Sequence, residues 1–388
     1  MPPTTQLFPE VADVSTLGQK FTSAVYLPIG IEGQAGAAGT AVVATLYRIT
    51  RKDEAVTLFD TAANSELSRQ IQQMLDQGAG PIIASAAAKG SLPTTVQRQA
   101  VWEKMESDEF IRLRLTDAVV QADLVALASS CNNADLLNNK QFAIMGMAAA
   151  TPKATLLTAA TAIAGATGTG PKRAVLVAPG VYDSLGTLRS GSFLAACVAA
   201  EIAKNGDPAN DLDLWPIPTL TAIEKTADGL GIFRRKVVAG SAVNDFEDLL
   251  QGGVSPVMPL TVPFGTISGV QISHLRTVFV TDTTFDSLMT REIVDQVFLD
   301  VKNYILTGAF LRAGNTQETR DRIESGVNAL LTERRSWITP ITQPDGKIGY
   351  GVNVVSSLDN RQVTVNYSGT VVRGISTVQV AAALTIPA

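Results

Sequence analysis

The most regular pattern in the chain is an alternation of apolar and polar side chains between residues 362 and 388. A period of two residues is typical of a half-buried β-strand. Such a strand needs a partner for its backbone amides and carbonyls. It can close a sheet of its own subunit, or it can be donated to the edge of a neighbour's sheet. The apolar positions of the pattern include Val363, Val365, Tyr367, Val378, Val380, Leu384 and Ile386.

The N-terminal residues also lack a helical pattern. Residues 1–20 are rich in Pro, Thr and polar side chains, so we expect an extended arm. Residues 21–31, which include Tyr26, form a candidate strand. Glycines at positions 30, 33, 36 and 39 then predict a flexible connector. The predicted N-terminal arm spans residues 1–30.

Strand and helix patterns alternate through the first half of the chain. Apolar runs at residues 142–147 and 174–178 predict buried strands, and residues 214–217 predict a further one. A helix that starts at Thr151 and one over residues 192–204 separate them. The second helix is apolar on nearly every side and should be buried. This order predicts a parallel sheet with right-handed crossovers. Upstream, the patterns predict strands at 40–49, 81–88 and 110–115 and helices at 65–77, 94–107 and 118–133.

The last third predicts two long helices, over residues 286–306 and 315–335, with Asn315 and Glu318 as a capping box for the second. A strand is expected over 270–281. Three prolines within residues 254–264 favour a linker or an irregular edge there. The exposed face of the 315–335 helix carries charges of both signs, which suits either a solvated surface or a docking surface.

The composition of the chain argues against several classes of protein. The 388 residues are 46% apolar, which suffices for a large core, and the net charge of −5 argues against a nucleic-acid surface. The two cysteines, Cys131 and Cys197, lie in apolar segments with a helical pattern. We therefore expect them to be buried thiols rather than a disulfide. No secretory signal and no membrane-spanning run is expected.

Few residues of the sequence suggest catalysis, metal binding or phosphate binding. His274 is the single histidine, so a histidine-based metal cluster is excluded, and no G-x-S-x-G motif accompanies it. The glycine-rich stretches 30–39 and 165–173 precede strands rather than helices, so they do not fit a phosphate loop. The position most like an enzyme site is the loop 178–184, with Asp183 and Ser184, because ligands of α/β proteins bind after parallel strands. A simple turn explains these residues equally well.

The order of these segments resembles that of contractile phage tail sheath proteins and related contractile injection systems. The resemblance runs from about residue 40 to the end, and the segments that carry it are 65–80, 139–146, 172–183, 191–203, 244–257, 273–305, 314–338 and 362–386. It implies a sheath core fold, α/β and α+β, with a central mixed or parallel sheet and flanking helices. It also implies extended N- and C-terminal β-arms that pair with neighbouring subunits, which favours donation of the strand at 362–388.

The resemblance implies a non-enzymatic structural protein without cofactor or metal, located in the tail of a virion and assembled in the host cytoplasm. Subunits would form stacked six-fold rings around an inner tail tube, bounded by baseplate and tail terminator proteins. Contraction would drive the tube through the host envelope for genome ejection. The expected domains are an arm (1–30), an α/β domain (31–260), an α+β domain (261–361) and a donated arm (362–388).

Two hypotheses accompany this interpretation. The face of the 315–335 helix that carries Arg334 and Arg335, or the adjoining turn at 336–350, would meet the inner tube. An α/β ligand-binding protein or enzyme that uses the loop 178–184 is the alternative from another class. A component of a different self-assembling shell or tube is the second alternative, and it would not need both ends of the chain as strand donors.

Overall fold

A computed structural model describes residues 27–137, 139–166, 173–205, 212–238, 241–262, 265–280, 287–307, 315–356 and 363–371. The helices are α2 (Lys52–Phe59), α3 (Glu66–Asp76), α4 (Thr95–Glu106), α5 (Gln121–Leu136), α6 (Lys153–Ala166), α7 (Gly191–Asn205), α8 (Asp245–Gln251), α9 (Leu288–Thr307) and α10 (Gln317–Glu333). The main sheet contains β1 (Ile29–Ala35), β2 (Tyr47–Ile49), β3 (Ile82–Lys89), β4 (Leu113–Thr116), β5 (Phe142–Gly146), β6 (Ala174–Ala178), β9 (Pro216–Ile217), β13 (Val254–Val262) and β14 (Gly265–Ile272).

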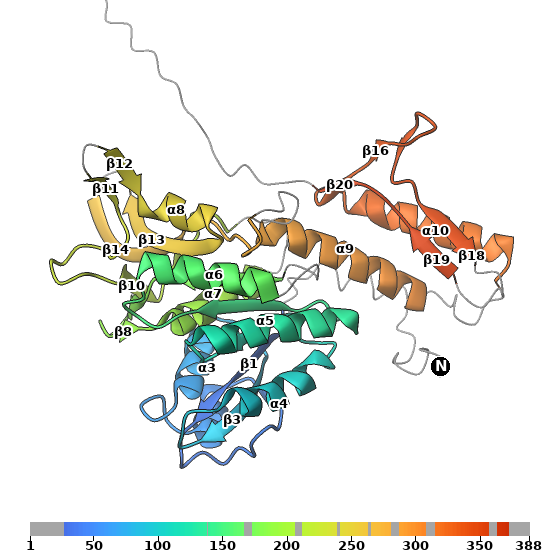
Figure 1. Ribbon diagram of the computed structural model, residues 1–388. Coiled ribbons are helices and arrows are strands. Elements are labelled where there is room, and N and C mark those ends of the chain that lie inside the picture. The colour runs from blue at the N-terminus through green and yellow to red at the C-terminus, as the bar shows by residue number, and fades with distance from the viewer. Residues whose placement is uncertain are drawn as a thin grey trace, which may run out of the picture.

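The main sheet is mixed, as the sequence predicts. Its strand order is β2-β3-β1-β4-β5-β6-β13-β14-β9. The strands from β3 to β13 in that order are parallel, whereas β2, β14 and β9 add antiparallel pairs at the two ends. Helices α3 and α7 cover one face, and α4, α5, α6 and α8 cover the other (Figure 1). The mixed sheet with flanking helices is therefore confirmed.

Strand alternation explains how one sheet serves two cores. Ile144 and Val175 point into the core beneath α7, whereas Met145 and Leu176, one residue further along each strand, point into the core beneath α5 and α6. Helix α7 is buried on every side from Gly191 to Ala203, as its sequence predicts.

The connector expected at the first glycines is wrong, because Gly30 and Gly33 lie inside β1, between β3 and β4. A β-carbon at Gly30 would meet the side chain of Ile111, and one at Gly33 would meet Asp117. These glycines therefore allow close packing rather than flexibility. The strand expected at 40–49 shortens to β2, because Ala44 adopts a left-handed φ of 55° and bonds to Ala86 instead.

The linker expected at residues 254–264 is also wrong. Residues 254–262 form β13, an interior strand that pairs with β6 on one side and β14 on the other. The parallel pairing ends at Pro256, and the register with β14 shifts after Pro259, so the prolines lie where ladder donors are least needed. Conversely, residues 216–217 form β9, which pairs with β14 at the sheet edge and does not follow β6.

The C-terminal residues build a second, smaller core. Helices α9 and α10 pack through Ile293, Val297, Val301, Ile323, Val327 and Leu331. Short strand pairs flank them: β15 (Ile338–Thr339) with β20 (Thr370–Val371), β16 (Ile341–Thr342) with β17 (Ile348–Gly349), and β18 (Asn353–Ser356) with β19 (Val363–Asn366). Thr316 rather than Asn315 caps α10, because its hydroxyl accepts from the Thr319 amide. The expected domain division at residues 260 and 261 falls within β13, and it stays a prediction.

Candidate functional site

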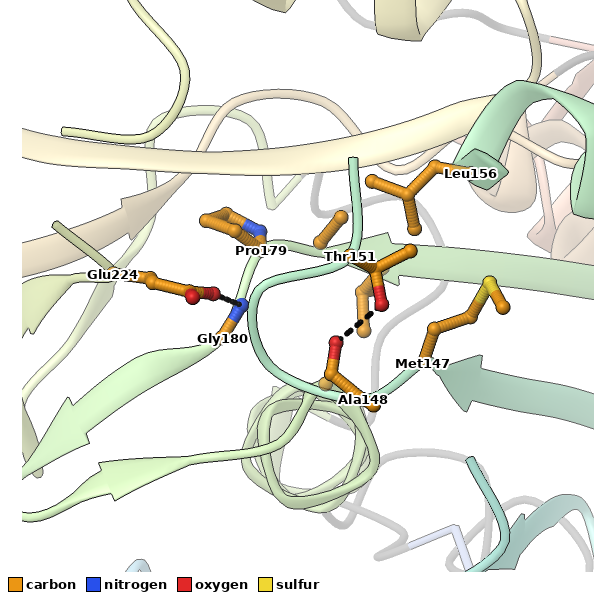
Figure 2. A pocket seen from close by; sticks show the side chains of 10 residues that line it. Met147, Ala148, Thr151, Leu156, Pro179, Gly180 and Glu224 are labelled. Atoms are coloured by element: carbon orange, nitrogen blue, oxygen red, sulfur yellow. Dashed lines mark hydrogen bonds between the residues drawn. The ribbon is translucent and has the colours of Figure 1, made fainter. Parts of the chain in front are cut away.

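The loop 178–184 follows β6 and borders a small cavity (Figure 2). Its lining includes Ala148, Thr151, Pro179 and Glu224, and its volume is ≈ 10 Å³. That volume is about what one water molecule needs. Pockets that bind small molecules are far larger, roughly 300–1,000 Å³. The cavity therefore cannot hold a substrate of ordinary size.

Glu224 accounts for the shape of the loop. Its Oε1 accepts a hydrogen bond from the Ala150 amide at 2.6 Å, and its Oε2 accepts one from the Gly180 amide at 3.1 Å. The Glu224 amide in turn donates to the Gly180 carbonyl at 2.8 Å. One carboxylate thus ties the loop after β5 to the loop after β6, which is a structural use of a buried acid.

Asp183 and Ser184 are the two polar residues of the loop that the sequence suggested for a binding site. Asp183 Oδ1 accepts from the Leu185 and Thr187 amides, and its Oδ2 accepts from Arg189 Nε at 2.7 Å. Although burial opposes ionisation, the Thr187 amide and the Arg189 guanidinium lower the pKa of Asp183. Ser184 is exposed. The loop is therefore a closed turn held by its own residues.

The other residues considered for catalysis or metal binding do not form a shared site among the residues that the structure describes. His274 Nδ1 lies 2.6 Å from Asp213 Oδ2. Cys131 and Cys197 are free and buried, as the sequence predicts. No group of three His, Cys, Asp or Glu side chains there could hold a metal ion. In the same part of the chain no helix combines the length and apolar character that crossing a membrane requires.

The candidate assembly element is the β18–β19 hairpin. Val354 pairs with Val365 and Ser356 with Val363, so residues 363–366 pair with their own chain. Val365 and Tyr367 pack against the C-terminal core, and burial raises the pKa of Tyr367 to about 12. Tyr26, Val378, Val380, Leu384 and Ile386 lie outside the described residues. The expected pairing of these positions with a neighbour stays a prediction.

The two arginines expected at the inner tube differ in their surroundings. Arg334 Nε lies 2.9 Å from Asp300 Oδ2, and its guanidinium lies 4.8 Å from the centre of the Trp337 ring. Arg334 therefore ties the end of α10 to α9 within the subunit. Arg335 is exposed. Of this pair, only Arg335 has an exposed side chain, and the expected contact with the inner tube stays a prediction.

Sequence reasoning missed two buried charge clusters. Arg98 binds Glu32, Asp117 and Asp123 at the main sheet, and Arg173 binds Asp135 and Asp295 between the sheet and α9. The available signals were Glu32 within the apolar run of β1 and Arg173 directly before β6. Neither residue indicates which side chains it pairs with, because those side chains lie far away in the sequence.

Solved structures with similar folds cover nearly the whole chain. A chain of the anti-feeding prophage baseplate superimposes with a TM-score of 0.66 at 12% identity, and 94% of each chain is covered. A sheath tail protein from Listeria innocua gives 0.65 at 11% identity, covering 93% of this chain and 95% of its own.

The contracted helical sheath of the anti-feeding prophage gives 0.64 at 12% identity, with 92% and 93% covered. This chain has the tail sheath fold. Neither a family model nor a curated protein sequence matches it. The sheath fold thus accounts for both the mixed sheet and the separate C-terminal core.

Proposed function

We propose that the chain is a structural tail sheath subunit. It polymerises around an inner tail tube and contracts to drive that tube through a host cell envelope. The observation that carries the proposal is the likeness to sheath structures over 92–94% of the chain, which includes the small C-terminal core as well as the main sheet. A cavity of ≈ 10 Å³ at the loop 178–184 leaves the ligand-binding alternative without a site.

Strand donation between subunits is part of the proposal. The β18–β19 pair has two strands, and α10 packs behind β18. A two-stranded sheet is stable only when it is backed or extended, because its outer edges present unpaired amides and carbonyls. The expected arms, residues 1–30 and 362–388, would complete such a sheet when neighbours donate them, although Ile29 and Gly30 belong to β1 of their own subunit. Because residues 363–371 pair and pack within their own subunit, the donated C-terminal segment is residues 372–388.

The proposed mechanism is mechanical. Subunits in six-fold rings form a kinetically trapped extended state, and a signal from the baseplate releases it. Each subunit then moves as a nearly rigid body into a shorter, wider packing while the arms keep the rings connected. Free energy stored at assembly drives the movement, so neither nucleotide nor cofactor is required. The remaining partners are the inner tube, on the side of Arg335, and a tail terminator protein.

Electron microscopy of the purified chain tests the proposal. The full-length chain should form wide cylinders, whereas a variant that ends at Val371 should stay folded but unpolymerised. A variant that ends at Arg361 is unsuitable, since it would remove Val365, Tyr367 and Val371 from the C-terminal core. Circular dichroism before and after truncation separates loss of assembly from loss of folding. Thin tubes, closed shells or monomers from the full-length chain would contradict the proposal.

A further inference from the structure

A two-stranded hairpin presents apolar and basic side chains at one extremity of the main sheet. It consists of β11 (Arg235–Val238) and β12 (Ser241–Asn244), and all four residues of β11 are exposed. Val237 is 74% exposed and Val238 50%. Each valine therefore leaves an apolar side chain on the solvent surface of this hairpin.

The orientation of the hairpin decides which charge it presents. Lys236 lies 3.1 Å from Asp245, the first residue of α8, so this face of β11 is turned toward α8. Alternate side chains of a strand point to opposite faces, so Arg235 and Val237 point away from α8. Arg235 has no ion-pair partner among the described residues. The outward face therefore offers one cation beside one apolar side chain.

A turn of complementary character follows α4. Glu109 and Phe110 are exposed there, with Phe110 at 75%, and Glu103 and Lys104 are exposed in the last turn of α4. The Phe110 amide donates to Asp108 Oδ1 at 2.9 Å, which fixes the shape of the turn. The C-terminal end of a helix carries a partial negative charge, so α4 adds to the field of the two glutamates. Despite Lys104, acidic residues outnumber basic ones between positions 103 and 110, so this acidic turn offers Glu109 beside the Phe110 ring as the counterpart of the hairpin.

The hairpin and the acidic turn lie at opposite corners of the subunit. Helix α4 packs on β3 and β1, whereas α8 packs on β13, and β4, β5 and β6 lie between them. At about 4.8 Å per strand, these positions are roughly 20 Å apart across the sheet. The acidic turn leads into β4, at the amino end of the parallel strands, whereas the hairpin precedes α8 and so lies at their carboxyl end. Figure 1 shows β11 and β12 far from α4. One subunit therefore cannot join the two surfaces itself.

We propose that the β11–β12 hairpin of one subunit docks on the acidic turn 103–110 of a second copy, with Arg235 against Glu109 and Val237 against Phe110. Complementary surfaces at opposite corners produce a head-to-tail contact, which repeats without closing on itself in a helical polymer. The contact rests on the proposed sheath function. It adds a direct, charge-matched interface between the bodies of neighbouring subunits, separate from their terminal arms.

Charge reversal with mixing tests this contact in the full-length chain. Arg235→Glu and Glu109→Arg each place like charges together, and each should raise the critical concentration for polymerisation at least about tenfold in low salt. A one-to-one mixture of the two variants should restore assembly, because every hairpin in an alternating polymer then meets a turn of opposite charge. The double variant should assemble for the same reason. Arg51→Glu, a reversal at the exposed N-cap residue of α2, is the control and should assemble as the wild type does.

The outcomes separate this contact from the proposed function. A wild-type chain that forms cylinders, together with single reversals that assemble equally well, overturns the contact and leaves the sheath function standing. Folded single variants that fail to assemble and are not rescued by mixing also overturn it. A wild-type chain that stays monomeric contradicts both proposals. Light scattering gives the critical concentrations, and circular dichroism verifies that each variant is folded.

Discussion

The guanidinium of Arg173 binds both carboxylate oxygens of Asp295, with Nε 2.8 Å from Oδ2 and Nη2 2.6 Å from Oδ1. Both side chains are nearly inaccessible, and Arg173 Nη1 also lies 2.7 Å from Asp135. Although burial opposes ionisation, Arg173 lowers the pKa of Asp295. This pair joins the main sheet to α9, between two hydrophobic cores that are separate clusters.

We predict that Asp295→Ala destabilises the chain strongly. Removing Asp295 takes the bidentate partner from the buried guanidinium of Arg173 and leaves it with Asp135 as its one remaining ion-pair partner among the described residues. The substitution also removes the ion pair with Arg291, and the combined loss costs about 3–5 kcal/mol. Denaturant unfolding measures the loss. Asp76→Ala, which removes an exposed ion pair with Lys52, serves as control and should change stability by about 1 kcal/mol at most. Equal effects of both substitutions would contradict the assignment.

Gly326→Ala should loosen the packing of α9 on α10. A β-carbon at position 326 would collide with the Tyr304 ring and hydroxyl, so either the Tyr304 side chain or one helix must shift. Overpacking of this kind costs about 1–3 kcal/mol. Gly165→Ala in α6 meets nothing within 4 Å and should stabilise by about 0.5–1 kcal/mol, because alanine favours helices. Thermal unfolding of the two variants should therefore move in opposite directions.

Glu32 should make stability depend on pH near neutrality. Burial and the neighbouring Asp117 outweigh Arg98 and raise the pKa of Glu32 from 4.5 to about 7. A carboxyl group with a raised pKa binds its proton more tightly in the folded chain. Its contribution to stability is fully present below about pH 4.5 and is lost as the pH rises through 7.

The unfolding free energy of the wild type should therefore increase relative to that of Glu32→Gln when the pH falls from 8 to 5. Glu54→Gln is the matched control, because hydrogen bonds from Thr50 lower the pKa of Glu54 and the trend should reverse. A difference between wild type and Glu32→Gln that does not vary with pH would refute the raised pKa.

Arg334→Glu and Arg335→Glu should act differently. The first reversal places a carboxylate against Asp300, which is fully buried, and should lower the melting temperature by several degrees. The second changes an exposed side chain, and its effect on stability should stay within about 0.5 kcal/mol. Only Arg335→Glu is therefore a clean test of tube binding, measured by co-sedimentation with inner tubes. Normal binding of this variant would remove Arg335 from the tube-facing surface.

The sequence predicted the parts of the fold that local patterns determine. The alternation of strands and helices and the all-round apolar character of α7 gave the parallel core and the buried helix. The sequence misled where a residue type occurs both in loops and in strands. The glycines that predicted a flexible connector permit close packing in β1, and the prolines that predicted a linker lie at the ends of the pairings of β13. The Arg173–Asp295 pair could not be predicted, because its partners are 122 residues apart and neither lies in a motif.

The position of α7 in the sequence has a consequence for how the chain folds while the ribosome synthesises it. Its main partners are α3, β4, β5 and β6, and all of them precede it. A nascent chain can thus cover α7, which is buried on every side, as soon as the ribosome has made it, before β13, α9 and the β18–β19 hairpin exist. Protein domains fold preferentially in this N-to-C order during translation. The apolar surface of α7 is then covered before the segments proposed to join subunits are available.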